Sequence, residues 1–433
     1  MSEKTDSKAG PKSVPQSRLG RFVRYAGLGA RTGASLLFSK DAKGAAATAA
    51  EVLGNMRGLA AKIGQMASYV DGVVPEAQRE AYEKALKGLR AAAPTSSPEA
   101  IQHAVEEDLG APIDRLFAEW ETAPFASASI GQVHRATLND GRRVAVKVQH
   151  PGISKAVESD LANAGMFQSM VSTFGPKNIN PKEVFDEIKT RFREELDYRL
   201  EAERQNFFRD FHAKDRWIRI PEIILDRSST RVLTSILAAG KTLEEAAAAS
   251  EEERRHFSEV LWRFVFKGNL VGRMFNADPH PGNYLFADDG TITFLDFGCC
   301  QPIEGARHEH AIGMHVSAVR RDETAFARAC AKMLETEGGS YEKKAISYTR
   351  ACFEPLFNAP YRFERSYVKS LVGGVMELKE EVFAKDNSFR PLPKGILFMN
   401  RLQFGFYSVL ARIEADADYA ATERAFLQEA GLL

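Results

Sequence analysis

Residues 273–298 read R-M-F-N-A-D-P-H-P-G-N-Y-L-F-A-D-D-G-T-I-T-F-L-D-F-G. In this stretch Asp278 opens a short loop, Asn283 follows in the same loop, and Asp296 begins a D-F-G sequence after an apolar strand. Phosphoryl transfer uses these residue types in this order, because amide and carboxylate oxygens hold the Mg²⁺ that bridges nucleotide phosphates. The stretch therefore predicts Asn283 and Asp296 as metal ligands. Asp278 is predicted to be the catalytic residue that orients or deprotonates the attacking hydroxyl or water.

A lysine upstream has the position that a nucleotide site requires. Lys147 ends the sequence V-A-V-K on the second of two alternating segments, 131–137 and 143–149, which the turn Asn139-Asp140-Gly141 joins into a hairpin. A single lysine on a strand is usually a solvated edge residue. Because the magnesium residues follow it in catalytic order, we predict instead that Lys147 holds the nucleotide phosphates.

The segment before this lysine replaces a glycine-rich loop. Kinases carry G-x-G-x-x-G here, whereas residues 125–134 read F-A-S-A-S-I-G-Q-V-H. Alanine methyl groups and serine hydroxyls restrict both positive φ angles and close approach to phosphates. The alternative is an ordinary β-turn. We predict a nucleotide-covering loop with an altered grip on the terminal phosphate, formed by Ala126, Ser127, Ala128, Ser129 and Gly131.

A charged segment over residues 190–208 is expected to be helical, and one of its acids should pair with the strand lysine. Exposed pairing within the helix is the default explanation for any one of these acids. Glu194, Asp197 and Glu201 fall on one helical stripe, whereas Glu195 lies well round from it. We predict that Glu201 forms the pair with Lys147.

Length and composition bound the rest of the interpretation. A chain of 433 residues exceeds the size of a single core, so two lobes are expected. Lys plus Arg and Asp plus Glu balance at 58 each, which argues against a nucleic-acid partner. The four cysteines lack paired spacing and are expected to be reduced thiols in a cytoplasmic protein. Charged and polar residues interrupt the most apolar segment, 395–411, so no membrane span is expected.

The N-terminal region divides into two parts. Residues 1–17 are polar and are expected to be disordered. Residues 18–43 interleave six Lys or Arg with apolar residues, against one acidic residue. Such a basic amphipathic helix can bind an anionic membrane surface peripherally, or it can dock on its own domain. Both interpretations remain open from the sequence.

Five motifs together resemble the UbiB/AarF family of atypical protein-kinase-like proteins. These are K-I-G-Q at 62–65, A-S-I-G-Q-V-H at 128–134, V-A-V-K at 144–147, E-L-D at 195–197 and N-A-D-P-H-P-G-N at 276–283. The resemblance implies an α+β, two-lobed kinase-like fold. In order, we expect a disordered tail (1–17), a helical extension (18–110), an N-lobe with a helical insertion (111–240) and a mostly helical C-lobe (241–433).

The resemblance also assigns roles that the spacing alone does not. In this family the extension folds over the cleft, so Lys62 and Gln65 would face the active site and gate it. Lys62 would meet Glu195 and Asp197, and the family pattern also assigns Glu201 to the lysine pair. The chain departs from the pattern at Asn276, where the family commonly has His, and at 89–91, where L-R-A replaces L-Q-D.

The family resemblance implies Mg²⁺ with ATP or ADP as cofactors and a role in ubiquinone or other isoprenoid lipid metabolism. We therefore predict an atypical kinase or ATPase whose partners include an isoprenoid or quinone-like small molecule. The alternative is a nucleotide-binding pseudokinase that regulates a biosynthetic complex without turnover. A phosphotransferase of the antibiotic-modifying kind would share the metal residues, but it would not explain the K-I-G-Q motif. No pattern in the chain predicts an oligomeric state.

Overall fold

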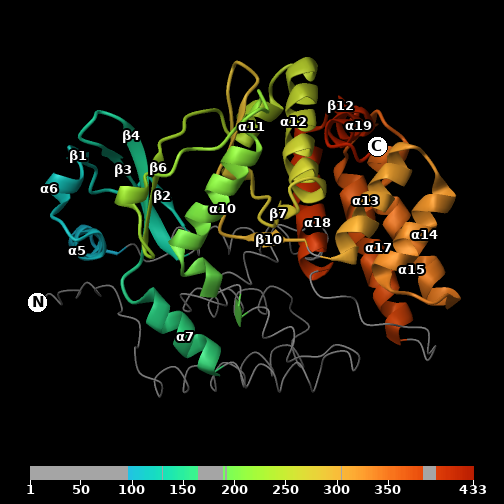
Figure 1. The fold of residues 1–433 in the computed structure, drawn as a ribbon, viewed down its shortest axis with the longest axis horizontal. Coiled ribbons are helices and arrows are strands. Elements are labelled where there is room, and N and C mark those ends of the chain that lie inside the picture. The colour runs from blue at the N-terminus through green and yellow to red at the C-terminus, as the bar shows by residue number, and fades with distance from the viewer. Residues whose placement is uncertain (1–95, 129, 164–188, 191–192, 304, 384–395) are drawn as a thin grey trace, which may run out of the picture.

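The computed structural model describes residues 96–433 apart from 129, 164–188, 191–192, 304 and 384–395. Within these residues a sheet-rich N-terminal lobe lies beside a larger helical C-terminal lobe (Figure 1). The expected α+β, two-lobed kinase-like class is confirmed. The segment 18–43, the predicted gating residues Lys62 and Gln65, and Ser129 of the nucleotide loop lie outside the described residues.

The N-lobe is built on an antiparallel sheet whose strands run in the order β1-β3-β4-β6, with β2 paired to β3. The strands are β1 (Glu119–Trp120), β2 (Ala126–Ser127), β3 (Gly131–Thr137), β4 (Arg143–Gln149) and β6 (Val232–Ile236). The two strands of the predicted hairpin are present with the predicted bounds. Gly141 has a φ of 87° in the turn between them, a conformation that glycine adopts without strain.

Buried and less buried side chains alternate along β4, and this alternation determines which side of the sheet Lys147 faces. Val144, Val146 and Val148 are fully buried on one side of the sheet, in a core shared with helix α5 (Pro98–Leu109). Successive side chains of a strand point to opposite faces, so Lys147 lies on the other side. That side is the one toward α10 (Tyr198–Phe211), which packs against β6.

The predicted helix over 190–208 is wrong as one continuous element. Asp197 has an extended backbone, with φ −117° and ψ 94°, and α10 begins only at the next residue. The Asp197 side chain accepts a hydrogen bond from the Arg199 N–H, a capping role that aspartate fills well. Glu194 and Glu195 therefore precede the break and do not share the helical stripe of Glu201. Upstream, the described part of the helical insertion is α7 (Ile153–Asn163).

Two small sheets hold residues 273–298. β8 (Tyr284–Phe286) and β9 (Ile292–Phe294) form a hairpin, and β5 (Ile218–Arg219) pairs with β9 in parallel. β7 (Met274–Asn276) pairs with β10 (Cys300–Pro302), with Asn276 opposite Cys300. This register brings the entrance of the Asp278 loop next to the exit of the D-F-G sequence.

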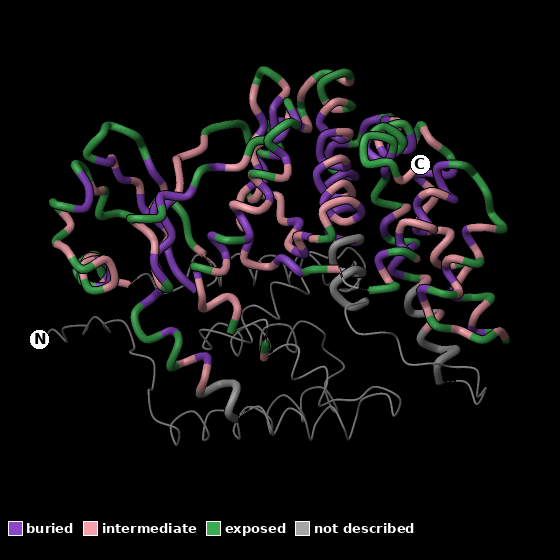
Figure 2. The backbone as a smooth tube through the Cα atoms, in the orientation of Figure 1, coloured by how far each residue is buried: buried purple, intermediate pink, exposed green. Residues whose placement is uncertain are grey.

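The C-lobe is helical and surrounds α12, whose buried positions stand out in Figure 2. Its helices are α11 (Leu243–Ala247), α12 (Glu251–Leu270), α13 (Ala306–Val319), α14 (Glu323–Leu334), α15 (Gly339–Cys352), α16 (Glu354–Phe357), α17 (Arg365–Phe383), α18 (Ile396–Ile413) and α19 (Tyr419–Glu429). Phe264 of α12 stacks on Phe294 of β9 with ring centroids 3.7 Å apart. The β8–β9 hairpin is thereby anchored to the main helix of the lobe.

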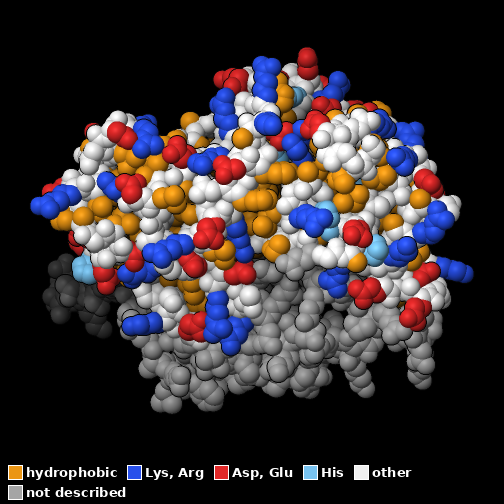
Figure 3. Space-filling view, viewed as in Figure 1, with side chains coloured by type: hydrophobic (Ala, Val, Ile, Leu, Met, Phe, Trp, Pro, Cys, Tyr) orange, Lys and Arg blue, Asp and Glu red, His pale blue; other side chains and the backbone are white. Residues whose placement is uncertain are grey.

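The predicted absence of a membrane span concerned the segment that forms most of α18. In the part of the chain that the structure describes, no helix combines the length and apolar character needed to cross a bilayer. On the face seen in Figure 3, acidic and basic side chains are interspersed, in keeping with the balanced charge.

Candidate functional site

The centre of the site is a lysine shared by two carboxylates. Lys147 Nζ lies 2.8 Å from Glu201 Oε1 and 3.0 Å from Oε2, and it lies 3.7 Å from Asp296 Oδ2. The Lys147 and Glu201 side chains are 18% and 6% exposed, whereas Asp296 is 38% exposed. The structure thus brings together three residues that the sequence placed in the site, and Asp296 is the most open of them to a ligand.

Two neighbouring carboxylates keep Lys147 protonated although its side chain is largely buried. Burial alone would lower the pKa of Lys147, but the carboxylates of Asp296 and Glu201 outweigh it and raise the pKa above the ordinary lysine value. The ammonium group also lies 5.0 Å from the ring centre of Tyr198, and burial raises the pKa of that tyrosine. Lys147 is therefore a fixed positive charge, suited to binding phosphate oxygens.

Asn276 links the Asp278 loop to the D-F-G sequence. Its side-chain oxygen accepts the backbone N–H of Asp278 at 3.0 Å, and its amide nitrogen donates to the carbonyl of Asp296 at 2.8 Å. One side chain thereby fixes the separation of two predicted active-site residues. Sequence reasoning noted Asn276 only as a departure from a family pattern, and its position immediately before the loop was the available signal.

Hydrogen bonds between its own residues hold the loop around Asp278 in place. Asn283 donates through Nδ2 to the Asp278 carbonyl at 3.0 Å, and the same nitrogen lies 3.5 Å from Asp278 Oδ2. That contact engages the amide nitrogen, so Asn283 Oδ1 is the atom suited to a cation. His280 accepts the Gly282 N–H through Nδ1 at 2.9 Å, at the start of the short helix η2 (Pro281–Asn283).

Asp296 is held by its backbone as well as by its side chain. Its φ is 60°, in the left-handed region that few residues other than glycine, asparagine and aspartate adopt. Its Oδ1 accepts the Gly298 N–H at 3.1 Å. A Cβ at position 298 would lie 3.3 Å from that oxygen and 3.4 Å from Glu201 Oε2, so the glycine leaves room for both carboxylates.

Arg204 is a site residue that the sequence analysis missed. It is on α10 one turn beyond Glu201 and buried, and it forms an ion pair with Glu194 at 2.7 Å. Its other terminal nitrogen donates to the Gly298 carbonyl at 2.9 Å. Arg204 therefore fastens the end of the D-F-G sequence to the helix that carries Glu201. An arginine in an acid-rich segment gave no signal of this long-range contact.

The predicted nucleotide loop begins as strand β2, which pairs with β3 in the N-lobe sheet. Ala126 and Ser127 are exposed on β2, and Ala128 N–H donates to the Gly131 carbonyl at 2.9 Å. A Cβ at Gly131 would come 2.2 Å from the Val148 carbonyl oxygen. The glycine at 131 is thus required by the neighbouring strand, whatever its relation to a phosphate.

The predicted gating contacts are only partly within the described residues. Asp197 is the capping residue of α10, and Glu195 lies just before that cap. Because Lys62 and Gln65 lie outside the described residues, the contact between Lys62 and these acids stays a prediction.

The donor set fits a hard divalent cation with a phosphate ligand. Asp296 and Asn283 offer carboxylate and amide oxygens, which Mg²⁺ prefers over nitrogen or sulfur ligands. Lys147 adds a fixed positive charge beside them. This combination can neutralise the phosphates of a nucleotide while leaving the Asp278 carboxylate to act on an attacking group.

Comparison with known proteins agrees with this geometry. A sequence model of the ABC1 atypical kinase-like domain matches residues 88–330. Atypical kinase COQ8B, mitochondrial, of Rattus norvegicus is 27% identical over 432 residues, covering 93% of this chain and 79% of that protein. Protein ACTIVITY OF BC1 COMPLEX KINASE 7, chloroplastic, of Arabidopsis thaliana is 33% identical over 268 residues, covering 60% of this chain. The alignment spans only 37% of the plant protein's length.

A solved structure shares the fold. The structure of Rv3197 from Mycobacterium tuberculosis, determined with erythromycin, superposes with a TM-score of 0.62 at 22% sequence identity. The superposition covers 94% of this chain and 97% of the other. At this identity the likeness establishes a common architecture.

Proposed function

Because the chain belongs to the ABC1 atypical kinase-like family, we propose that it binds a magnesium complex of ATP or ADP and hydrolyses ATP or transfers its γ-phosphoryl group. The observation that supports this most is the contact of Lys147 with both Glu201 and Asp296. An active kinase needs a lysine held by a helical acid and a D-F-G aspartate at the metal. Here both carboxylates meet the same ammonium group.

Each residue has a separate task in this proposal. Lys147 binds phosphate oxygens, and Glu201 positions the lysine. Asn283 and Asp296 would hold Mg²⁺, which would supply positive charge to neutralise the phosphates. Asn276 and Arg204 keep the two loops in register through the bonds to Asp278, Asp296 and Gly298.

Asp278 orients or deprotonates the attacking hydroxyl or water. Its backbone is fixed at the N–H by Asn276 and at the carbonyl by Asn283, so the carboxylate projects from a rigid loop. Such pre-positioning lowers the entropic cost of bringing an acceptor to the γ-phosphate. Residues 126–129 cover the nucleotide, and Lys62, Gln65, Glu195 and Asp197 gate the acceptor side.

The biological setting that we propose is ubiquinone or isoprenoid lipid metabolism. The motif resemblance supports it, as do the relatives named atypical kinase COQ8. A quinone-like or isoprenoid molecule is then the acceptor or effector. The basic segment 18–43 would place the protein peripherally on an anionic membrane surface.

Turnover by the purified chain tests the proposal. We expect magnesium-dependent phosphate release from ATP, measured with and without anionic liposomes and quinone-precursor mimics. Lys147→Met should abolish the release, whereas Lys214→Met, at an exposed lysine, should leave it unchanged. Magnesium-dependent ATP binding without turnover under every condition would contradict an enzyme and support the regulatory pseudokinase. Absence of nucleotide binding would reject both.

A further inference from the structure

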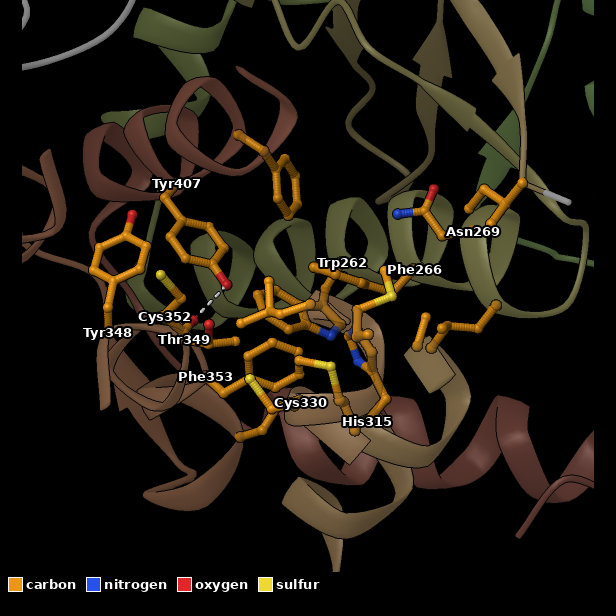
Figure 4. Close-up of a pocket in the computed structure, with 18 residues that line it drawn as sticks. Trp262, Phe266, Asn269, His315, Cys330, Tyr348, Thr349, Cys352, Phe353 and Tyr407 are labelled. Carbon is orange, nitrogen blue, oxygen red and sulfur yellow. Dashed lines mark hydrogen bonds between the residues drawn. The ribbon is translucent and has the colours of Figure 1, made fainter. Parts of the chain in front are cut away.

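The C-lobe contains a cavity that the nucleotide site does not use. It has a volume of about 150 Å³ and lies among helices α12, α13, α14, α15, α16 and α18 (Figure 4). None of Lys147, Glu201, Asp278 or Asp296 lines it. A cavity of this size can hold a small molecule, because engineered apolar cavities of similar volume in close-packed interiors bind benzene.

The walls of the cavity are aromatic. Trp262 and Phe266 contribute from α12, Phe353 follows α15, and Phe406 contributes from α18. The faces of such rings favour a planar aromatic guest, through offset-stacked or edge-to-face contacts. The wall composition therefore selects a ring, in preference to a flexible polar molecule.

One polar group on this wall lacks a partner. Asn269 lies at the end of α12, on the same helical stripe as Trp262 and Phe266, and its amide is drawn beside them in Figure 4. Its Oδ1 is buried and accepts no hydrogen bond from the described residues. A buried acceptor without a donor is costly to a fold, so a ligand that brings a donor gains affinity there.

Three other polar side chains of the lining already have hydrogen-bond partners. His315 Nδ1 lies 2.9 Å from Glu423 Oε2, the Tyr407 hydroxyl donates to the Cys352 carbonyl at 2.9 Å, and the Thr349 hydroxyl donates to the Ala345 carbonyl at 2.8 Å. The Tyr348 hydroxyl lies near the Cys352 thiol, but it is also buried without a hydrogen-bond partner among the described residues. None of the residues that line the cavity is a lysine, arginine, aspartate or glutamate, so the lining favours a neutral guest.

We propose that this cavity is a binding site for a small neutral aromatic molecule of one or two rings that carries a single N–H or O–H donor. The ring packs between the walls formed by Trp262, Phe266 and Phe406. The donor bonds Asn269 Oδ1.

Two isosteric probes separate shape from hydrogen bonding. Indole carries an N–H donor, whereas benzofuran has the same shape and an oxygen in its place. Isothermal titration of the full chain should give about ten-fold tighter binding of indole, the order expected when a buried acceptor is satisfied in one complex and not in the other. Equal affinities for the two probes would overturn the role of Asn269. Failure of both to bind would overturn the site.

Variants assign the binding to this cavity. Asn269→Leu should remove the preference for indole over benzofuran, while Asn358→Leu, at an exposed asparagine of the same lobe, should retain it. Ala311→Met extends a side chain into the cavity from α13 and should weaken both probes at least about ten-fold, if the variant folds. Indole binding that keeps its preference in Asn269→Leu would place the probe elsewhere and reject the proposal, even if the Ala311 variant does not fold.

Discussion

Gly405 of α18 lies directly against the ring of Pro279, in the loop that follows Asp278. A Cβ built at position 405 would stand 2.7 Å from Pro279 Cγ, closer than real Cβ contacts come. The neighbouring residue in the loop is Asp278, whose carboxylate we assign to the attacking group. A helix near the end of the chain thus supports the loop on which the proposed chemistry depends.

Gly405→Ala should push the loop away from α18. We expect a loss of about 1–3 kcal/mol of stability from overpacking, together with a larger relative fall in turnover than in nucleotide affinity. Gly373→Ala is the matched control, because a Cβ there meets nothing within 4 Å. Denaturant unfolding and ATP turnover are the measurements. A Gly405 variant that matches the control in both would show that the loop does not depend on this contact.

Glu201→Gln keeps the shape of the side chain and removes the charge nearest Lys147. We expect turnover to fall by roughly 10²-fold, because the lysine loses the partner that orients it toward the phosphates. Steady-state phosphate release with saturating magnesium checks this. Glu203→Gln, at an exposed position on the same helix, should behave as the parent protein does. Equal loss in both variants would mean that the pair has no special role.

Asp296→Asn should remove most of the thermal stabilisation that magnesium with ADP or ATP confers. Asparagine accepts the left-handed backbone at this position, so the fold should survive the change. In the parent protein, ligand at 100 times its Kd should add about 2.7 kcal/mol. Melting temperatures with and without magnesium nucleotide are compared, with Asp288→Asn as an exposed control. An unchanged shift in the Asp296 variant would refute the metal assignment.

The decrease in folding stability at acidic pH should depend on Asp215 and His212. Burial opposes the charge of Asp215, but hydrogen bonds from His212, Lys267 and Arg263 outweigh it and lower its pKa below the ordinary 3.8. The folded state therefore stays ionised where the unfolded state takes up a proton, and stability falls as the pH drops below that value. Burial also lowers the pKa of His212 from 6.5, so a shallower loss begins near that pH.

Asp215→Asn should reduce stability at neutral pH and flatten the steep part of the loss below about pH 4. Urea unfolding across a pH series is the measurement. Asp210→Asn, at an exposed aspartate in α10, should keep the parent profile. If the Asp215 variant loses stability at acidic pH as the parent protein does, another carboxylate causes that loss.

Short sequence patterns predicted those elements whose structure depends mainly on residues near one another in the chain. Alternation over 131–149 and the Asn-Asp-Gly turn gave the hairpin. Glu201 was chosen from a helical stripe that also included Glu194 and Asp197, and it contacts Lys147 although that helix is not continuous. The helix break at Asp197 was missed, because a capping aspartate within a charged run looks the same as a helical one. The sequence signal for this break was the E-L-D motif at 195–197.

Contacts between distant segments could not be predicted in this way. Arg204 reaches Gly298 and Gly405 meets Pro279, and each pair is separated by about a hundred residues or more. Such pairs depend on how helices pack, which no short pattern records. The cavity beside Asn269 likewise arises from six helices together.

The asparagine at position 276 also affects how the contact between the two loops responds to pH. The family pattern that the motifs resemble has histidine at this position, and a neutral imidazole offers one donor and one acceptor, the two functions that the Asn276 side chain uses here. An imidazole that gains a proton near pH 6.5 becomes a donor at both nitrogens and repels the Asp278 N–H it had accepted. The amide does not titrate, so in this chain the coupling between the two loops is insensitive to mild acidification.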